Sequence, residues 1–498
     1  MRTVVIGAGI AGLATATLLA REGHRVTLVE RTGEVGGRAG SLAVDGFRWD
    51  TGPSWYLMPE AFDRFFAAAG TSTAEQLDLV RLDPSYRVYP EGADPVDVPA
   101  GREAAAALFD ALEPGGGAAL RRYLDSGRLA YTVAVRRFLY TTFSSPRPFL
   151  HRDVLGHVGL LLRLLLTPLD RWAAGFVRDR RLRQILTYNA VFLASRPSAT
   201  PALYHLLSHA DMDQGVFYPR GGFAAVVDAL HGLARDAGVE ILTDTEVTSV
   251  DVADGRVTGV TTSAGRIPAG TVVSSADLHH TETALLAPGQ RTWPERRWRH
   301  RDPGPGAVVV MLGVRGRLPE LAHHTLFFSR DWDADFREVF EGEGPDAWSR
   351  SVYVSRPSAT DPTVAPAGHE NLFVLVPVPA DPATGHGDAY AAAESPAVGR
   401  IADAAVRLIA RRTGVTDLAE RTVVRRTLGP ADFAERYHSW RGGALGLAHT
   451  LRQSAFLRGS NASRKVDGLY YSGATTLPGV GVPMCLISAE NVLLRLRR

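Results

Sequence analysis

Cysteine, lysine and an excess of one sign of charge are nearly absent from this sequence of 498 residues. With one cysteine, Cys485, the chain cannot form an internal disulfide or a metal cluster on several thiolates, and this thiol is expected to be a small buried hydrophobe in a reducing compartment. With one lysine, Lys465, nearly all of the positive charge is arginine. Because 55 basic residues balance 53 acidic ones, nothing in the composition predicts nucleic acid as a partner.

Long apolar runs are also lacking. No stretch reaches the roughly 18 consecutive apolar residues that a membrane-spanning helix needs. Residues 1–19 have the apolar character of a signal peptide, but they carry three glycines at fixed offsets, so we expect this segment to be retained and folded. The chain is therefore expected in the cytoplasm.

The length predicts two or three domains, because a single hydrophobic core stops growing well before 498 residues. A strand at 4–6, a helix over 10–21 and a strand over 25–30 predict a βαβ unit at the start. The region 102–209 has a mostly helical pattern. Further strands are predicted at 240–242, 247–252, 256–262, 271–274, 307–314, 372–378 and 469–472, loops at 357–366 and 377–387, and helices at 402–413 and from about residue 484.

The strongest motif is Gly-x-Gly-x-x-Gly at Gly7, Gly9 and Gly12, between the first strand and the first helix. Gly7 permits a tight turn, Gly9 lets the backbone approach a pyrophosphate, and Gly12 lets the helix pack on the strand. The helix N-terminus then faces the phosphates with its free N–H groups. Glu30 ends the second strand, where a carboxylate accepts hydrogen bonds from ribose hydroxyls and repels a 2′-phosphate. These residues predict a site for the ADP half of a dinucleotide.

A second glycine turn, Gly36-Gly37-Arg38, follows and ends at Ser41. Paired glycines bring backbone N–H groups to phosphates, and an arginine adds charge-assisted donors. Together with the first motif and Glu30, this turn resembles the signature of the amine oxidase-like flavoprotein superfamily. In that superfamily the turn wraps the FAD diphosphate, so the resemblance implies FAD as the cofactor.

Residues 468–484 (GLYYSGATTLPGVGVPM) strongly resemble the C-terminus of bacterial-type phytoene desaturases, the carotenoid/retinoid oxidoreductases of that superfamily. Residues 47–53, 201–204, 218–222 and 275–277 are similar to internal landmarks of the same family, in the same order. Ser472, Thr476-Leu477 and Arg458-Gly459 depart from the family pattern and leave the particular substrate open. The turn at Gly479 and Gly481 opens a helix whose first N–H groups can face the flavin and favour negative charge on the reduced ring.

The resemblance implies an α/β fold, with a discontinuous Rossmann-type FAD-binding domain and a mixed-sheet substrate domain under a helical cap. The expected ranges are 1–75, 217–285 and 462–498 for the FAD-binding domain, 76–101 and 286–461 for the substrate domain, and 102–216 for the cap. The expected cofactor-binding residues are Gly7, Gly9, Ala11, Gly12, Glu30, Arg31, Gly37, Arg38, Thr51, Gly52, Val247, Gly473, Val482 and Met484. No catalytic acid or base is assigned.

The implied reaction is desaturation of a long polyisoprenoid such as phytoene in carotenoid biosynthesis, by hydride transfer to flavin N5. Alternatives are a later carotenoid desaturase, a ketolase-like oxygenase, an isomerase, or a non-catalytic FAD-holding partner of a biosynthetic complex. With only one dinucleotide motif, a quinone or O2 is the expected electron acceptor. The oligomeric state is left open.

Residues 154–172 (VLGHVGLLLRLLLTPLDRW) are the most apolar stretch. Leucines with arginines and a terminal tryptophan suit a helix in a membrane interface, but an ordinary buried helix has the same pattern. The lipid-soluble substrates of the resembled family favour peripheral membrane contact.

Histidines and acids give weaker signals. The adjacent pairs His279-His280 and His323-His324 lack the i, i+4 spacing of a helical metal site, and no metal is expected. Residues His205, His209, Asp211 and Asp213 lie close together in the sequence and could act as acid or base, although structural hydrogen bonding is the more common role.

Overall fold

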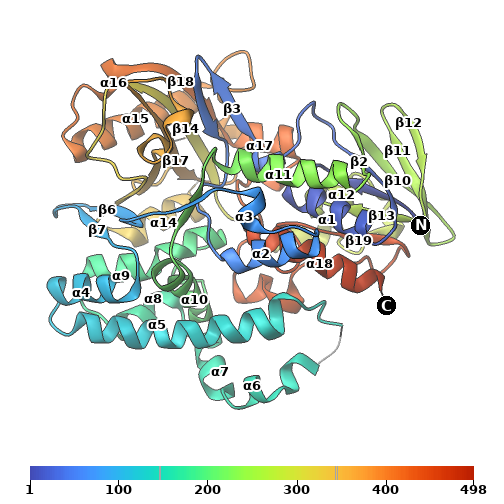
Figure 1. Cartoon of the computed structure of the whole chain (residues 1–498), viewed down its shortest axis with the longest axis horizontal. Helices are drawn as coiled ribbons and strands as arrows, with labels where there is room; N and C mark the ends of the chain where they lie inside the picture. Colours follow the sequence, from blue (N-terminus) through green and yellow to red (C-terminus); the bar gives the residue numbers. More distant parts are fainter. Residues whose placement is uncertain (145–146, 343, 345, 498) are drawn as a thin grey trace.

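The computed structural model describes residues 1–144, 147–342, 344 and 346–497 (Figure 1). Residues 145, 146, 343, 345 and 498, which fall within the predicted domain ranges, lie outside the described part. Two large sheets, three smaller ones and a helical region form the described part of the molecule, and the two chain ends lie on the same side of it (Figure 1).

The first sheet is parallel and takes its strands from both ends and the middle of the chain. Its order is β19 (Leu469–Tyr471), β13 (Thr271–Ser274), β1 (Arg2–Ile6), β2 (Arg25–Val29) and β9 (Glu240–Leu242). Because alternate side chains of a strand point to opposite faces, Val5 packs with the helices of one face and Val4 and Ile6 with the strands of the other. The predicted βαβ unit is thus present at the centre of the sheet.

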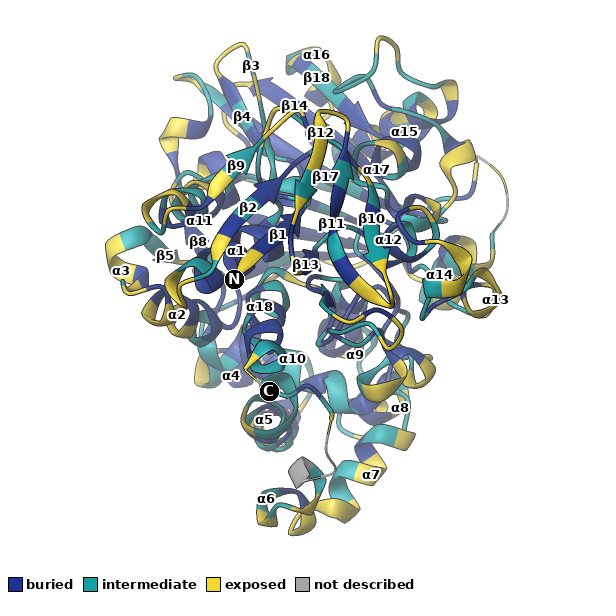
Figure 2. Ribbon diagram, turned by 90° about the vertical axis from the view of Figure 1, so that its right-hand side faces the viewer, coloured by how far each residue is buried: buried dark blue, intermediate teal, exposed yellow. Residues whose placement is uncertain are grey.

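Each face of this sheet is covered by one layer. The helices α1 (Ile10–Arg21), α11 (Phe223–Asp236) and α18 (Val482–Leu496) pack together on the first face. The second face carries an antiparallel sheet of β10 (Val247–Ala253), β11 (Arg256–Thr262) and β12 (Gly265–Pro268). Figure 2 shows β1 and α1 largely buried between these layers.

The second sheet is mixed. Its order is β18 (Thr422–Leu428), β14 (Gly306–Arg315), β17 (His369–Val378), β16 (Val352–Ser355), β15 (His324–Phe328), β6 (Tyr86–Pro90) and β7 (Val96–Val98). Only the pair β15 and β6 is parallel within this sheet of the described chain. The helix α15 (Pro396–Thr413) packs its apolar side on one face, and it begins six residues before the predicted helix at 402.

Shorter elements connect these layers. The two-stranded sheets are β3 (Ser41–Val44) with β4 (Phe47–Asp50), and β5 (Leu79–Arg81) with β8 (Phe217–Pro219). The remaining helices outside the helical region are α2 (Pro59–Ala68), α3 (Thr73–Gln76), α12 (Leu278–Thr283), α13 (Glu295–Trp298), α14 (Trp332–Glu341), α16 (Leu418–Arg421) and α17 (Pro430–Tyr437).

The helical region begins with α4 (Arg102–Leu112) and α5 (Gly116–Val133) and ends with α9 (Arg180–Thr187) and α10 (Leu206–His209). The apolar stretch 154–172, expected as one helix, is three: α6 (Arg152–Leu155), α7 (Val158–Leu166) and α8 (Leu169–Ala174). Gly156 follows α6 and Pro168 precedes α8, and both residues disfavour a continuous helix. Among the described residues, no helix has the length and apolarity to cross a bilayer.

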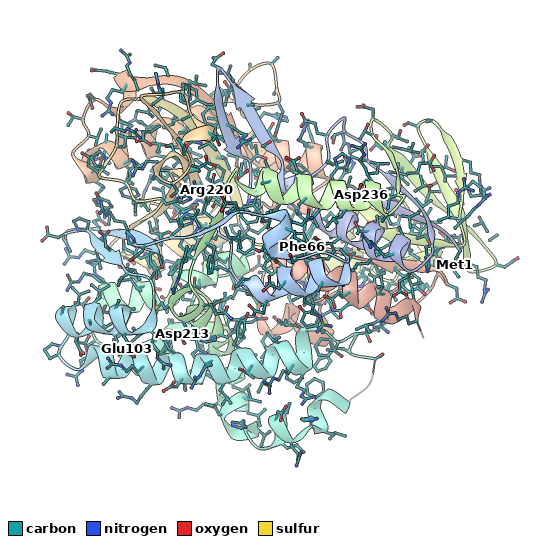
Figure 3. The ribbon with its side chains drawn as sticks, in the orientation of Figure 1. Met1, Phe66, Glu103, Asp213, Arg220 and Asp236 are labelled. Carbon is teal, nitrogen blue, oxygen red and sulfur yellow. The ribbon has the colours of Figure 1, made fainter. Side chains whose placement is uncertain are left out.

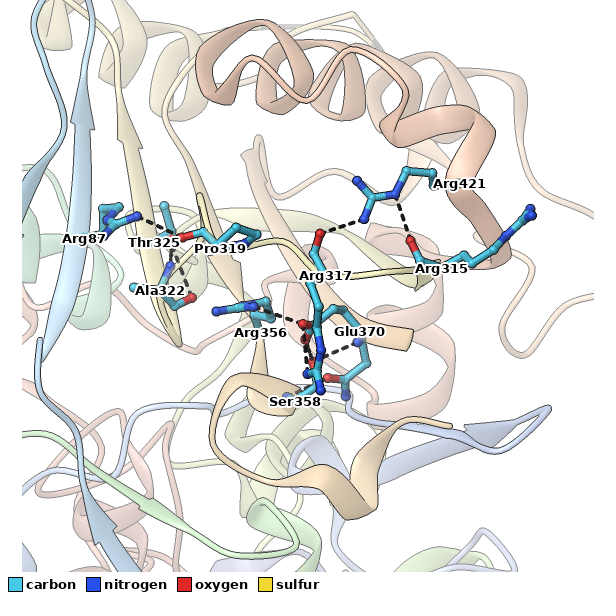
Figure 4. A network of polar contacts seen from close by, with 11 residues as sticks. Arg87, Arg315, Arg317, Pro319, Ala322, Thr325, Arg356, Ser358, Glu370 and Arg421 are labelled. Carbon is cyan, nitrogen blue, oxygen red and sulfur yellow. Dashed lines mark hydrogen bonds and ion pairs between the residues drawn. The ribbon is translucent and has the colours of Figure 1, made fainter. Parts of the chain in front are cut away.

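A buried carboxylate lies at the start of β17, an interior strand of the second sheet (Figure 4). Glu370, whose side chain is fully buried, accepts from Arg356 at 3.1 Å and from the hydroxyl of Ser358 at 2.5 Å. Arg317 reaches the same carboxylate at 3.4 Å, but 73% of its side chain is exposed. Arg356 is only 12% exposed, so Glu370 is the counter-charge that makes its burial tolerable.

We predict that Glu370→Gln lowers the free energy of unfolding by about 3–5 kcal/mol, because it leaves the buried Arg356 charge without a counter-ion. The matched control is Arg317→Gln, which removes an exposed partner of the same carboxylate and should change stability by about 1 kcal/mol or less. Chemical denaturation of both variants tests this; equal effects would contradict it.

Candidate active site

The glycine loop at the end of β1 is held by backbone contacts that only glycine permits. Gly7 has a φ of +90°, and a Cβ on Gly12 would lie 1.8 Å from the carbonyl oxygen of Gly7. Ser275 lies 2.7 Å from the carbonyl oxygens of Ile6 and Gly7, with which its hydroxyl shares its hydrogen. The segment 275–277 therefore stabilises the turn by hydrogen bonds to its carbonyl groups.

Gly9 is different, because the protein itself does not require a glycine there. A Cβ on Gly9 would have no protein atom nearer than 3.9 Å, the atoms in question being in Gly36 and Gly37. Nearby, the Nε atom of Arg38 is buried and has no hydrogen-bond partner among the described residues. A space kept free in front of the α1 N-terminus, beside a donor without an acceptor, fits a bound diphosphate.

Glu30 closes the same loop from the next strand. One carboxylate oxygen accepts from the backbone N–H of Ala8 at 2.8 Å, and the other accepts from the N–H and hydroxyl of Thr32 at 3.0 and 2.9 Å. The side chain is 8% exposed. The carboxylate therefore lies beside the glycine loop, where the sequence placed it for a ribose.

The Gly36-Gly37-Arg38 turn packs directly on this loop. Gly9 and Gly36 form a parallel bridge, and both turn glycines have positive φ, +109° for Gly36 and +58° for Gly37. A Cβ on Gly52 would lie 2.0 Å from the carbonyl oxygen of Arg38. Thr51, which is 2% exposed, donates from its N–H and its hydroxyl to the carbonyl oxygen of Gly40. Residues 51–52 thus fix the turn by close backbone contact.

Two predicted cofactor residues lie at the margin of this group. Arg31 donates to His438 at 2.9 Å and to the carbonyl of Glu435, so it contacts the segment after α17. Val247 is buried in the core between β1 and the β10–β12 sheet, and Thr245 connects this segment to the Glu30 carbonyl at 2.9 Å.

The second glycine turn, at the end of β19, lies next to the first. Gly473 has a φ of +115°, and its Cβ would lie 3.5 Å from that of Ala11 in α1. The Gly473 N–H donates to Ser488 at 3.0 Å, and the Ser488 hydroxyl donates to the Leu477 carbonyl at 2.8 Å. Asn461 donates to the carbonyls of Tyr471 at 3.1 Å and Leu477 at 2.9 Å. This network holds the turn that begins α18.

The helix α18 begins at Val482, two residues before the predicted start, with Pro483 in its first turn. That first turn contains no acidic residue. Its free N–H groups and positive dipole end are therefore not neutralised by a side chain of the same turn.

Two buried residues behind this turn were missed by sequence reasoning. Arg458 is 2% exposed and donates to four carbonyl oxygens, those of Ala474 at 2.7 Å, Thr476 at 3.0 Å, Leu447 at 3.2 Å and Gln453 at 3.4 Å. Burial lowers the pKa of Arg458 to about 10. The ring of His449 fills the space where a Cβ of Gly479 would stand, at 2.1 Å, which explains the glycine. The Arg458-Gly459 departure marked this place but gave no sign of its burial.

A cavity of about 680 Å³ begins at these turns. At one end its wall is formed by residues 52–55 and 477–484, which include Gly52, Val482 and Met484. From there it runs between the second sheet and the helical region to α6 and α7, with a further side at α14. The lining residues are predominantly apolar and aromatic, and many of them come from the helical region, as in Phe138, Phe149, Val154, Leu161 and Leu165.

Ser54, Trp55 and Tyr353 line the cavity, and His324, which is not among the lining residues, packs against them. Trp55 stacks on His324 with ring centroids 4.3 Å apart, and His324 Nδ1 lies 2.7 Å from the Tyr353 hydroxyl, which also meets Ser54 at 2.7 Å. Burial lowers the pKa of His324 far below its usual range. This histidine is therefore neutral and acts as a packed, hydrogen-bonded ring rather than as a cation.

The other polar candidates do not gather into a metal site. Among the described residues, no group of three or more His, Cys, Asp or Glu side chains could hold a metal ion. His205 is 1% exposed, and burial lowers its pKa to about 4. His209 pairs with Asp213 at 2.6 Å, whereas Asp211 is separately buried against Tyr188.

Known proteins match this chain over nearly its whole length. The model of the family described as flavin containing amine oxidoreductase matches residues 10–492. A carotenoid 3,4-desaturase of Haloarcula japonica is 42% identical over 98% of this chain and 96% of its own length. A zeta-carotene-forming phytoene desaturase of Myxococcus xanthus is 35% identical over 99% of this chain and 93% of its own.

Solved structures show the same fold at much lower identity. An oxidoreductase from Methanosarcina mazei is 17% identical and superposes with a TM-score of 0.60, covering 99% of this chain and all of the other. The flavin cofactor, the enzyme class and the α/β fold expected from the sequence are thereby confirmed. The chain belongs to the flavin-containing amine oxidoreductase family and is an FAD-dependent oxidoreductase.

Proposed function

We propose that this enzyme introduces double bonds into a long, linear carotenoid hydrocarbon. The cavity carries the proposal: it is elongated, lined mostly by apolar side chains, and reaches from the α18 N-terminus to the surface helices α6 and α7. A hydrocarbon without polar groups needs such a dry channel, because specificity for it comes from shape rather than from hydrogen bonds. The names of the two relatives support the same class of reaction.

FAD is proposed to lie across the carboxyl edge of the first sheet. Gly7, Gly9 and Gly12 would receive the diphosphate at the start of α1, with Gly37 and Arg38 on its other side and Glu30 on the ribose. The other proposed contacts are Ala11, Arg31, Thr51, Gly52, Val247, Gly473, Val482 and Met484. When bound, the flavin supplies a hydride acceptor next to the cavity.

The chain's own residues then have two tasks. The α18 N-terminus, with no acid in its first turn, would stabilise negative charge on the end of the ring that it faces. The walls between Trp55 and Met484 would hold one allylic carbon of the substrate against the ring and exclude water.

Within this class, phytoene and a later, more unsaturated carotenoid are both candidates, since one relative of each kind matches almost the whole chain. A ketolase-like or isomerase activity and a non-catalytic FAD-holding role are further alternatives. A quinone or O2 is the proposed electron acceptor. We also propose that 1–75, 217–285 and 462–498 form the FAD-binding unit, 76–101 and 286–461 the substrate unit, and 102–216 the cap.

The outer end of the cavity is a surface that we call the rim patch. It consists of exposed apolar side chains on α6–α7 and on the segment 451–457, which meet where Phe456 contacts Phe149 with ring centroids 5.2 Å apart. Leu162, Leu166 and Phe456 are 51%, 71% and 56% exposed. The members are Leu150, Leu155, Val158, Leu162, Leu166, Leu451, Phe456 and Leu457.

Exposed arginines lie close to the members of the rim patch in the sequence, namely Arg152, Arg163, Arg171 and Arg452. Figure 2 shows exposed residues along α6 and α7, which lie at the edge of the molecule in Figure 1. Apolar side chains flanked by arginines at the mouth of an apolar cavity suit the interface of an anionic bilayer. We therefore propose that the enzyme docks there peripherally in the cytoplasm and takes its substrate from the lipid.

The first of three predictions from the proposed function tests the cofactor loop. Gly9→Val should leave the fold intact and weaken FAD binding about 100-fold or more, because its side chain fills the space proposed for the diphosphate. The matched control is Gly12→Ala, whose Cβ would overlap the Gly7 carbonyl and should destabilise the fold itself. Flavin absorbance together with thermal unfolding distinguishes these effects. Full FAD occupancy in Gly9→Val would show that the diphosphate lies elsewhere.

The second prediction tests the reaction. The anaerobic enzyme is mixed in liposomes with phytoene and, in a parallel experiment, with a more unsaturated carotenoid. With its substrate, it should lose its oxidised flavin absorbance and yield products with additional double bonds. The preferred substrate is the one with the faster bleaching. Oxidised flavin in the presence of both substrates, with FAD bound, would favour the non-catalytic alternative.

The third prediction tests docking. The double variant Leu155→Ser and Leu166→Ser should weaken binding to anionic liposomes about tenfold or more, since two exposed leucines that do not line the cavity contribute roughly 1 kcal/mol each. The control is Leu161→Ser with Leu165→Ser on α7, since both of these leucines line the cavity. They should impair turnover more than liposome binding. If the first pair binds liposomes normally, the docking surface is elsewhere.

A further inference from the structure

Asp211 is a buried carboxyl that the proposed function leaves unused. It lies in the one-turn π-helix 210–214 after α10 and is 0% exposed. Its Oδ2 accepts from the hydroxyl of Tyr188 at 2.7 Å and from the amide of Asn189 at 3.4 Å. A buried carboxyl has a large desolvation penalty when ionised, and hydrogen bonds of this kind offset only part of it.

The groups that face Asp211 include no cation among the described residues. Tyr86 approaches from β6, Tyr123 from α5, and Tyr188 with Asn189 from the 3₁₀-helix 188–193. On its own turn, Asp213 adds a like charge and is itself paired with His209 at 2.6 Å and within 3.9 Å of Arg102; Figure 3 labels Asp213 above α5.

Burial raises the pKa of Asp211 to about 7, with the hydrogen bonds from Tyr188 and Asn189 acting in the opposite direction. Both protonation states are therefore populated near neutral pH. A carboxyl of this kind can take up and release a proton within the working range of an enzyme.

Tyr188 connects this carboxyl to the cavity. Its side chain is part of the cavity wall, and its ring centroid lies 6.0 Å from that of Trp55 and 5.5 Å from that of Phe192. Trp55, Phe192 and Met484 pack against one cluster of buried side chains. Tyr188 thus lines the cavity beside Trp55 and Phe192, which pack against the same cluster as Met484 in the first turn of α18, where the flavin ring is proposed to lie.

Desaturation requires a proton acceptor as well as a hydride acceptor. Two hydrogens leave neighbouring carbons: one goes with its electron pair to the flavin, the other leaves as a proton, and its bond electrons form the new double bond. Among the described residues that line the cavity, Asp335 is the one with a carboxylate. That carboxylate already accepts hydrogen bonds from Ser329 at 2.7 Å, Ser351 at 2.6 Å and the Arg350 N–H at 2.5 Å. His449 is buried against Gly479 and Leu193.

We propose that Tyr188 is the catalytic residue that receives the substrate proton, and that Asp211 acts through it as the final proton acceptor. The proton binds Tyr188 Oη as the tyrosine's own proton passes along the 2.7 Å hydrogen bond to Asp211 Oδ2. Tyr188 ends neutral and Asp211 ends as the protonated acid, so neither residue carries a charge after the transfer. This inference rests on the proposed desaturase function.

The test is an anaerobic single turnover of the full-length, FAD-loaded enzyme in liposomes between pH 5.5 and 9. Its substrate is the carotenoid that reduces the wild-type flavin fastest. The wild-type rate should rise as pH increases through about 7, because only ionised Asp211 can accept the proton. Asp211→Asn should lower the rate about 100-fold or more and abolish this rise. Asp211→Glu should restore part of both.

Tyr188→Phe is the second variant and removes the transfer atom while leaving the carboxyl in place. It should also slow product formation about 100-fold or more. An infrared C=O band of the protonated Asp211 carboxyl should persist in Tyr188→Phe and titrate at higher pH than in the wild type, because the hydrogen bond that lowers its pKa is lost, and it should vanish in Asp211→Asn. The matched control is Tyr123→Phe, whose buried hydroxyl donates to the Leu186 carbonyl away from the cavity wall and should retain the wild-type profile.

The outcomes separate the two proposals. If the wild-type flavin stays oxidised and no product forms with any carotenoid offered, the desaturase function fails. If the wild type turns over and Tyr188→Phe, folded and loaded with FAD, matches it at every pH, the proton route is wrong and the function stands. A rising limb that survives in Asp211→Asn would likewise overturn the role of this carboxyl.

Discussion

The approach of α1 to the end of β1 constrains everything around it. A Cβ on Gly12 would lie 1.8 Å from the carbonyl oxygen of Gly7. The helix α1 can therefore pack this close to the end of β1 only when residue 12 is glycine. The same helix packs on α11 and α18, and Ala11 meets Gly473 from the other end of the chain. One close backbone contact therefore fixes the position of the Gly7–Gly12 loop and its distance from the second glycine turn. The two parts of the proposed cofactor site share this support.

Local patterns in the sequence predict the parts of this arrangement that depend on neighbours in the chain. The βαβ order, the glycines at 7, 9 and 12, and Glu30 at the end of β2 follow from spacing alone. The pattern of residues 154–172 predicts one helix, whereas the structure divides this stretch into three at Gly156 and near Pro168, two residues that are visible in the sequence. Trp55 on His324, or Tyr188 on Asp211, could not be predicted, since each pair joins segments whose contact exists only after the tertiary fold forms.

The apolar lining of the cavity suits the proposed hydrocarbon substrate, which has no polar groups. A hydrocarbon gains little on moving from lipid to a dry channel, because both surroundings are apolar, so binding energy cannot come from burial alone. Shape along the wall must then select the carbon that faces the flavin. This explains why the polar residues near the cavity are engaged in hydrogen bonds with one another, as in Ser54, Tyr353 and His324, rather than presented as a substrate clamp.

Arg458 adds a link between the mouth of the cavity and its catalytic end. Its guanidinium bonds the carbonyls of Leu447 and Gln453, next to the rim patch, and those of Ala474 and Thr476, in the turn before α18. Because these acceptors are neutral carbonyls, the charge is hydrogen-bonded but not cancelled, and it reinforces the positive end of α18. The segment 447–458, which includes part of the rim patch, is therefore tied by hydrogen bonds to the turn that begins α18. In the proposed arrangement, Arg458 would couple substrate entry at the rim patch to the position of the flavin ring.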